Sequence, residues 1–479
     1  MAKTFADAIF EAELHSKQAP KHAALSGLTG DDIRLVQEAL NPFRVFNVKQ
    51  FDAPQVYAND DSVGYGYFFE LIDCLANRTL TGNAARTAIT SVLSQYTERT
   101  AKALTRVLLK DLKCGAGVSV LEKVYPHVHF PSFELMLAAK IEEKPQALRA
   151  KDVVLTPAIL LKKYGLKFPV GAEAKYDGNR MVAIVNHGVV EFRSRNGLLI
   201  EWVTDVFDAE LRRIEQYVGQ PVVVDGEVLA RSFQETSEAK GSKNLKAKKH
   251  LKFYAFDYMP LSTWNAQLPT DPQHRRSANL LQMTEVLDLR KIIKSKSKIC
   301  YTIAELVAFY AEVLEDGKND DGTLNGLGEG LIIKNLAGVY EWDRSNFWFK
   351  WKPVIDVDLT IVGFEYGKAG SKNHDKLGGM LIEGKDENGN FIRATAGGFK
   401  VSGPELKKFI EEKAAEVGIT GKAFEALNRD QFFRKYVMEH QNEFLGKTGM
   451  FEAQELTLAS GETVYSLRFP QFVRIRDDK

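Results

Sequence analysis

Apolar residues in the first 150 positions recur at intervals of three and four, the spacing that lines one face of an α-helix. The segments 31–40 and 101–110 show this spacing clearly, and strand-like alternation is almost absent nearby. Gly115 and Gly117 interrupt the pattern before apolar residues resume at 118–124. The sequence therefore predicts an all-α domain over residues 1–150.

A second pattern follows a linker of mixed character at 142–155. From 151 to 354, short β-like runs alternate with helix-like runs such as 203–217 and 304–314. Alternation of this kind is typical of an α+β domain.

The last part of the chain, 355–479, is built of short strand-like runs separated by glycine turns. Helical sequence is inserted at 404–436. Many short strands with glycine turns predict a small β-barrel of the OB type. The predicted strands are 359–366, 378–382, 391–394 and 461–475. The whole chain is thus expected to be a multidomain protein.

Composition excludes several classes of protein. The chain has 479 residues, of which 44% are hydrophobic, and no apolar run approaches the roughly 18 residues of a membrane span. The N-terminus lacks the pattern of a secretory signal, so we expect a cytoplasmic protein without a membrane partner, in the host cytoplasm if the source is viral. Three cysteines without a Cys-x-x-Cys pair cannot form a four-cysteine zinc module.

A net charge of +1 is unusual for a protein that binds nucleic acid, so local clusters must supply the positive field. The segment 240–250 has five lysines and no acidic residue. We expect a phosphate-contacting loop there, although a solvated surface loop would have the same composition. The candidate residues are Lys240, Lys243, Lys246, Lys248 and Lys249.

A second basic segment lies at the glycine interruption of the helical region. Lys110 and Lys113 flank glycines whose backbone N–H groups, at the start of a helix, would suit a DNA phosphate. A plain helix-turn-helix with glycine caps is the alternative. The candidates are Lys110, Lys113, Gly115 and Gly117.

The segment Lys175-Tyr176-Asp177-Gly178-Asn179-Arg180 places an amine where a strand meets a tight turn. Lysine attacks an electrophile only as the neutral amine, which neighbouring cations or a metal would favour. Taken alone, the same string also fits a surface hairpin.

Further short motifs follow in order. Each combines a strand-like run with acidic, aromatic or basic residues. They are Ser194 to Gly197, Asp225-Gly226-Glu227, Phe253 to Tyr258, Glu329 to Lys334, Phe347 to Lys352, Arg468-Phe469-Pro470 and Arg474 to Lys479. Alternation of aromatic residues and lysines puts Lys350 and Lys352 on one face of a strand.

This ordered set resembles the covalent lysyl-AMP nucleotidyltransferases, and specifically the ATP-dependent DNA ligases. The helical segments 80–85 and 110–119, and the segment 356–363, are similar to ligases of T-even-like bacteriophages. The resemblance implies a helical DNA-binding domain at 1–150, an ATP-grasp-like adenylation domain at 151–354 and an OB-fold domain at 355–479. It further implies ATP and Mg²⁺ as cofactors and nicked double-stranded DNA as the partner of a monomeric enzyme.

The resemblance also implies roles for single residues. Lys175 is the nucleophile, and Lys334, Lys350 and Lys352 are expected to converge on the α-phosphate. Glu227 and Glu329 are the candidate Mg²⁺ ligands. The expected ATP-binding residues are Glu173, Arg180, Arg195, Glu227, Phe256, Lys334, Arg474, Arg476 and Lys479.

Three other functions stay open at this point. An RNA ligase or an mRNA-capping guanylyltransferase would share the Lys-x-Asp-Gly motif. The helical first domain and the sequence Arg468-Phe469-Pro470 favour the DNA ligase over both. A non-catalytic scaffold that binds nucleic acid is the third, and it is disfavoured because every candidate catalytic position holds a competent residue.

Overall fold

The computed structural model describes residues 4–15, 18–48, 50–145, 153–231, 233–241, 245–319, 325–369, 371–386, 388–458 and 462–476. The chain divides into two compact units. One comprises Met1–Phe133 with the short segments Asn196–Leu198 and Ile419–Asn428, and the other comprises the rest. Within the described ranges, no helix is long and apolar enough to cross a membrane.

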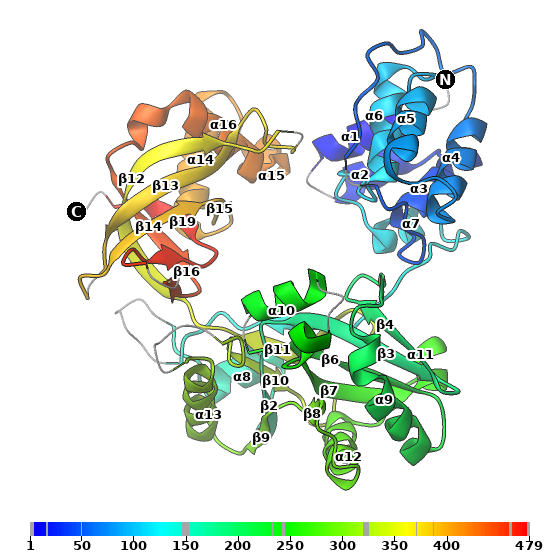
Figure 1. Ribbon diagram of the computed structural model, residues 1–479. Helices are drawn as coiled ribbons and strands as arrows, with labels where there is room; N and C mark the ends of the chain where they lie inside the picture. Colours follow the sequence, from blue (N-terminus) through cyan, green and yellow to red (C-terminus); the bar gives the residue numbers. More distant parts are fainter. Residues whose placement is uncertain are drawn as a thin grey trace. The chain divides into compact units, whose positions relative to one another are not determined.

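The N-terminal unit is helical, as predicted (Figure 1). Buried apolar side chains such as Phe5, Ile72 and Leu104 form one core between its helices. The predicted helices at 31–40 and 101–110 correspond to α3 and α6. The helices are α1 (Phe5–Leu14), α2 (Gln18–Leu25), α3 (Asp31–Leu40), α4 (Gly66–Ala76), α5 (Gly82–Leu93), α6 (Glu98–Leu108) and α7 (Val118–Val124).

The middle of the chain forms two sheets. The first is ordered β1-β11-β10-β2-β9, and the second β5-β4-β3-β6-β7-β8. Their strands are β1 (Leu137–Lys140), β2 (Val170–Ala174), β3 (Asn179–Asn186), β4 (Val189–Ser194), β5 (Leu199–Ile200), β6 (Val222–Leu229), β7 (Lys252–Pro260), β8 (Ile292–Lys294), β9 (Ser297–Cys300), β10 (Leu331–Lys334) and β11 (Arg344–Trp351).

Helices cover one side of each sheet. Side chains of α13, such as Phe309 and Val313, share a buried core with β2, β10 and β11, whereas α9 and α12 cover the β3–β8 sheet (Figure 1). The predicted helices 203–217 and 304–314 correspond to α9 and α13. The helices are α8 (Pro157–Tyr164), α9 (Thr204–Val218), α10 (Phe233–Gly241), α11 (Leu261–Asn265), α12 (Gln273–Val286) and α13 (Ile303–Asp316), with a short 3-10 turn at Leu245–Lys248.

Strand β1 lies in a segment for which we predicted helix, and that prediction is wrong. Leu137 to Lys140 pair in parallel with β11, so this segment belongs to the first sheet. The apolar run around it is too short for its spacing to distinguish a strand from a helix, and only the distant partner strand decides.

The C-terminal strands form a third sheet, ordered β14-β13-β12-β16-β19-β15. It curls into a half-barrel consistent with an OB-fold (Figure 1). Its strands are β12 (Ile355–Tyr366), β13 (Leu377–Lys385), β14 (Phe391–Ala396), β15 (Gly398–Phe399), β16 (Thr448–Ala453) and β19 (Gln471–Ile475), with β17 (Leu456–Thr457) and β18 (Ser466–Leu467) as a separate pair. The predicted helical insertion is present as α14 (Pro404–Glu416), α15 (Gly421–Ala426) and α16 (Arg429–Glu439), followed by a 3-10 turn at Gln441–Glu443.

All three cysteines are free. Cys114 and Cys300 are buried, as expected of small apolar side chains, but Cys74 on α4 is exposed.

Candidate active site

One face of the first sheet gathers three of the candidate residues. Glu173 on β2 lies opposite Ile332 on β10, which lies opposite Lys350 on β11. One pleat farther along, Lys334 lies opposite Trp348. Because side chains alternate along a strand, these residues share one face while their neighbours enter the core beneath it. The buried neighbours are Ala172, Ala174, Leu331, Ile333, Phe349 and Trp351.

Lys175 follows β2 directly and stays anchored to the sheet. Its N–H donates to the carbonyl of Gly330 at 2.9 Å, and its carbonyl accepts from the N–H of Glu329 at 2.8 Å. Its ammonium is ion-paired with the Glu329 carboxylate, which also accepts the ammonium of Lys352. The structure therefore joins the predicted nucleophile, a predicted metal ligand and one predicted phosphate lysine in a single cluster.

The charges of this cluster perturb one another. Burial raises the pKa of Glu329, but the ammonium groups of Lys175 and Lys352 outweigh it and hold the pKa below its ordinary value. Burial, and then the like charge of Lys175, lower the pKa of Lys352. The pKa of Lys350 is lowered by burial and then by Lys352. The lysines thus form a compact cationic site around one carboxylate.

The turn after Lys175 requires glycine because it approaches β6 closely. A Cβ on Gly178 would lie 2.4 Å from the carbonyl oxygen of Val228, a distance that real side chains do not adopt. The N–H of Gly178 donates to Oε1 of Glu227 at 3.2 Å. Burial raises the pKa of Glu227 to about 7. The glycine therefore brings a second candidate carboxylate close to the nucleophile.

Glu173 is buried in a cluster of donors. Its Oε2 accepts the ammonium of Lys334 at 3.0 Å and that of Lys294 at 3.3 Å, while Oε1 accepts the hydroxyl of Ser295. The ammonium of Lys334 also donates to the carbonyl of Phe256 at 3.2 Å. Burial lowers the pKa of Lys334. The structure thus places Lys334 next to Glu173 rather than next to Lys352.

Aromatic rings line the same region. Phe256 on β7 meets Trp348 edge to face, with ring centroids 5.9 Å apart. The ammonium of Lys334 lies 4.3 Å from the centre of the Trp348 ring and 5.6 Å from that of Phe256. Indole Nε1 of Trp348 donates to Gln273 at 2.8 Å, which fixes the orientation of the ring. These rings can hold a flat heterocycle.

Arg180 is engaged inside the protein. Its guanidinium makes a bidentate pair with Asp225, at 3.0 and 2.6 Å, and donates to the carbonyl of Met136. Asp225 is therefore a buried partner of Arg180 within β6 and not a turn residue. Arg195, just after β4, is exposed.

A second ionic group joins the turn of the nucleophile to the C-terminal strands. Arg468, directly after β18, donates to Asp177 at 2.5 Å and to Glu455 at 2.9 Å. Burial raises the pKa of Glu455. A pocket of about 550 Å³ opens beside this group. Its lining includes Asp177, Glu329, Glu455, Arg468 and Phe469.

The two C-terminal arginines that we predicted to bind ATP are at the third sheet. Arg474 is on β19, and Arg476 follows it and donates to Asp358 on β12 at 2.6 Å. Lys479 is outside the described residues. Asp356 lies inside β12 and pairs with Lys144 at 2.9 Å, so it is a strand residue and not a hinge. Residues 352–354 form the irregular connection between β11 of the first sheet and β12 of the third.

The predicted DNA-binding residues of the helical unit have different environments. The ammonium of Lys110 donates to the carbonyls of Glu38 and of Asn41, the latter at 2.7 Å, at the end of α3. Burial lowers the pKa of Lys110 to about 8. Lys113 is exposed. Both glycines are exposed as well, and the second caps α7; they are Gly115 and Gly117.

The lysine-rich segment is similarly divided. Lys248 is buried, and its ammonium lies 3.2 Å from both carboxylate oxygens of Asp205. Lys243 lies outside the described residues. The exposed lysines of this segment are Lys240, Lys246 and Lys249.

A metal site made of protein side chains alone is absent from the described part of the chain, because no three His, Cys, Asp or Glu groups are suitably placed. Glu329 and Glu227 are nevertheless carboxylates near Lys175. Mg²⁺ is commonly held by one or two carboxylates together with substrate phosphates. The donor set therefore fits a metal that arrives with a nucleotide.

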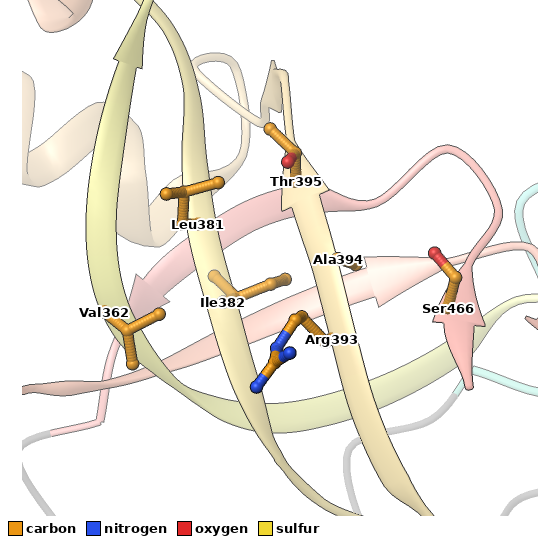
Figure 2. A pocket seen from close by; sticks show the side chains of 7 residues that line it. All are labelled: Val362, Leu381, Ile382, Arg393, Ala394, Thr395 and Ser466. Carbon is orange, nitrogen blue, oxygen red and sulfur yellow. The ribbon is translucent and has the colours of Figure 1, made fainter. Parts of the chain in front are cut away.

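A further pocket lies on the curled sheet. Figure 2 shows its lining side chains, which lie on β12, β13, β14 and β18. The pocket has a volume of about 440 Å³. Its charged member, Arg393, is paired with Glu383 at 3.1 Å. None of the lining residues is a predicted nucleotide ligand. They are Val362, Leu381, Ile382, Arg393, Ala394, Thr395 and Ser466.

Sequence reasoning missed four residues that complete the site. Trp348 and Arg468 lie within motifs that were noted but were given no role. Asp225 directly continues the apolar run of β6, a signal that could have placed it within a strand. Lys294 carries no such signal, because its partner is 121 residues away along the chain.

Comparisons with known proteins show similarity to DNA ligases. A family model for the ATP dependent DNA ligase domain matches residues 137–352. The chain is 29% identical to the DNA ligase of Enterobacteria phage T4, over 85% of this chain and 81% of that protein. The identity to the DNA ligase of Halobacterium salinarum is 24%, over 82% and 71% of the two chains.

A solved structure named Pmar-Lig_PreS3 superimposes with a TM-score of 0.71 at 24% identity, covering 99% of each chain, and so supports the overall fold. These sequence matches define a nucleotidyltransferase. More specifically, the chain belongs to the ATP-dependent DNA ligases. The family match specifies ATP as the nucleotide.

Proposed function

We propose that this ligase seals nicks in duplex DNA through a covalent AMP on Lys175. The observation that carries the proposal is the position of this amine. It lies at the end of β2, paired with Glu329 and close to Lys352, on the sheet face that also holds Glu173 and Lys350. A cationic site of this kind suits a phosphate under attack.

Three phosphoryl transfers make up the proposed reaction. Neutral Nζ of Lys175 attacks the α-phosphorus of ATP, a P–N bond forms and pyrophosphate leaves. The 5′-phosphate of the nick then attacks the same phosphorus, which releases the lysine and gives a DNA-adenylate. Finally the 3′-hydroxyl attacks the 5′-phosphate, and AMP leaves.

The residues around Lys175 have different proposed roles. Its ion pair with Glu329 must open before the amine attacks, because an ammonium has no free electron pair. Lys350 and Lys352 stabilise charge on the phosphate oxygens. Glu173, Phe256, Lys334 and Trp348 form the end of the site that holds the base, and Arg180, Arg195 and Glu227 lie toward the ribose.

Mg²⁺ is proposed to be held by Glu329 and Glu227 together with ATP phosphates. When bound, it neutralises phosphate charge and increases the electrophilicity of phosphorus. Both carboxylates are negatively charged oxygen donors, which this ion prefers.

The pairing of Arg468 with Asp177 supports a rearrangement during the cycle. We propose that Arg474 and Arg476 orient the leaving pyrophosphate together with Lys479. In this structure Arg474 lies on β19 and Arg476 directly after it, whereas Arg468 contacts the turn of the nucleophile. The connection 352–354 is the proposed hinge by which the curled sheet changes position between nucleotide attack and DNA sealing.

The helical unit is proposed as a DNA-binding domain, the middle sheets as the adenylation domain and the curled sheet as an OB-fold domain. Lys113, Gly115 and Gly117 are the proposed phosphate contacts of the helical unit. In the lysine-rich segment, the proposed contacts to DNA phosphates are Lys240, Lys243, Lys246 and Lys249. Lys110 is proposed to hold the backbone carbonyls at the end of α3 in place. Lys248 is proposed to hold the carboxylate of Asp205. We propose a monomer in solution.

Labelling with α-³²P-ATP tests the proposal. The wild-type protein should retain label through denaturation, and Lys175→Ala should retain none, whereas Lys162→Ala on α8 should label normally. Release of the label should accompany joining of a nicked duplex. Label on Lys175→Ala would refute the nucleophile, and labelling by GTP with capping of RNA ends would indicate a guanylyltransferase.

A further inference from the structure

The segment between β8 and β9 crosses from one sheet of the adenylation domain to the other beside Glu173. Lys294 ends β8 in the second sheet, and Ser297 begins β9, where it lies opposite Glu173 in the first. The crossing is fixed on both sides, since the N–H of Ser295 donates to the carbonyl of Ala255 and the carbonyl of Lys296 accepts from Ala174, each at 2.8 Å. Its side chains therefore have a defined position.

The acceptor positions on Glu173 are nearly all used. An ionised carboxylate offers about four acceptor positions. Three are taken, by Lys334 and Lys294 on Oε2 and by the Ser295 hydroxyl on Oε1. The remaining position is on Oε1, the oxygen with a single partner. Glu173 can therefore accept one more N–H.

The ammonium of Lys294, by contrast, has no N–H to spare. It has three N–H groups but four acceptors at 3.0–3.3 Å: Glu173 Oε2, the carbonyl and hydroxyl of Ser295, and the hydroxyl of Ser297. The side chains of Lys294 and Glu173 are each 5% exposed. Glu173 thus keeps an acceptor position for a ligand, whereas Lys294 has no donor to spare.

Adenine and guanine differ at the 6-position in whether they donate or accept a hydrogen bond. Adenine carries an amino group there, which donates, whereas guanine carries a carbonyl, which accepts. Glu173 lies two residues, or about 7 Å along the strand, from the lysine proposed to hold the α-phosphate. The aromatic rings of Phe256 and Trp348 lie in the same region.

We propose that Lys294 is a positioning residue for nucleotide specificity: together with Ser295 it fixes the carboxylate of Glu173 so that its free acceptor reads the 6-amino group of ATP. This inference rests on the proposed lysyl-AMP chemistry. Lys294 lies outside every sequence motif of the site and acts through Glu173 rather than by touching the nucleotide.

The test compares ATP with purine riboside triphosphate, which lacks the 6-amino group, in single-turnover formation of the covalent nucleotide. Wild type should prefer ATP by about 100-fold or more, because a site that hydrogen-bonds a substrate group rejects the analogue without it. Lys294→Met should reduce this preference about tenfold, through a higher apparent KM for ATP and with little change in the saturated rate. Lys298→Met, on exposed β9, is the control and should match wild type.

Two results would overturn the inference. In one, Lys294→Met keeps the wild-type preference; in the other, it slows both nucleotides equally, as a merely structural residue would. If that variant does not fold by circular dichroism, Ser295→Ala tests the same carboxylate with the same criteria. Failure of the proposed chemistry is separate, since it would appear as label on Lys175→Ala.

Discussion

We predict that the ion pair between Arg468 and Asp177 serves DNA sealing and not adenylation. Arg468 contacts the turn of the nucleophile, whereas Arg474 and Arg476 are on the curled sheet with other partners. If those arginines are needed for attack on ATP, the pair must break in that step and form again for DNA sealing. Arg468→Met should then impair sealing from the adenylated enzyme and leave adenylation nearly unchanged.

The magnitude follows from the geometry of the two contacts. A hydrogen bond to a charged partner contributes about 1.5–3 kcal/mol. The Arg468 side chain is 21% exposed, so solvent weakens the interaction and we take about 1.5–2 kcal/mol. This corresponds to about a 10- to 30-fold slower step. Loss of the arginine also leaves the Asp177 and Glu455 carboxylates without their shared cation.

The assay separates the two steps by rapid quench. Pre-adenylated enzyme, freed of ATP, is mixed with nicked duplex for one turnover, and adenylation by ATP is timed in a separate experiment. Asp177→Asn should show the same step selectivity, and the double variant should be no slower than either single one, because both remove one interaction. Arg393→Met, on β14, is the control. Equal slowing of both steps, or no slowing, would refute this assignment.

Three further predictions concern single groups. Glu329→Gln removes the charge that pairs with Lys175 and should raise the Mg²⁺ concentration for half-maximal adenylation at least tenfold, measured by metal titration after EDTA treatment. Lys110→Met removes the ammonium that caps α3. It should lower the free energy of unfolding of the helical unit by about 1–2 kcal/mol, measured by thermal unfolding monitored by circular dichroism. Replacement of Lys246 and Lys249 by Gln should reduce the slope of log affinity for nicked DNA against log salt by about 2.

The first two of these predictions have a matched control, and each of the three has a result that would contradict it. Glu341→Gln should leave the Mg²⁺ dependence unchanged, and an unshifted midpoint for Glu329→Gln would count against a metal role. Lys102→Met, exposed on α6, should not change stability. A loss of DNA affinity without loss of stability in Lys110→Met would show a direct phosphate contact. An unchanged salt slope would remove the lysine-rich segment from the DNA surface.

Local sequence was sufficient for much of the architecture. The spacing of apolar residues located helices such as α3 and α9, because a helix shows its buried face within a few turns of the chain. Turn chemistry placed Lys175 at a strand end, and the order of the motifs identified the family. Each of these features depends on residues that are neighbours in sequence.

Only the tertiary structure decided which side chains meet. Strand register set Glu173 beside Lys334 and Lys294, and it made Asp225 a partner of Arg180 rather than a turn residue. Helix packing turned Lys110 toward the end of α3. Pairing between strands more than 100 residues apart is chosen by the packing of whole sheets, which no local pattern records. The sequence thus determined the chemistry available to this ligase, and the fold determined which groups act on one another.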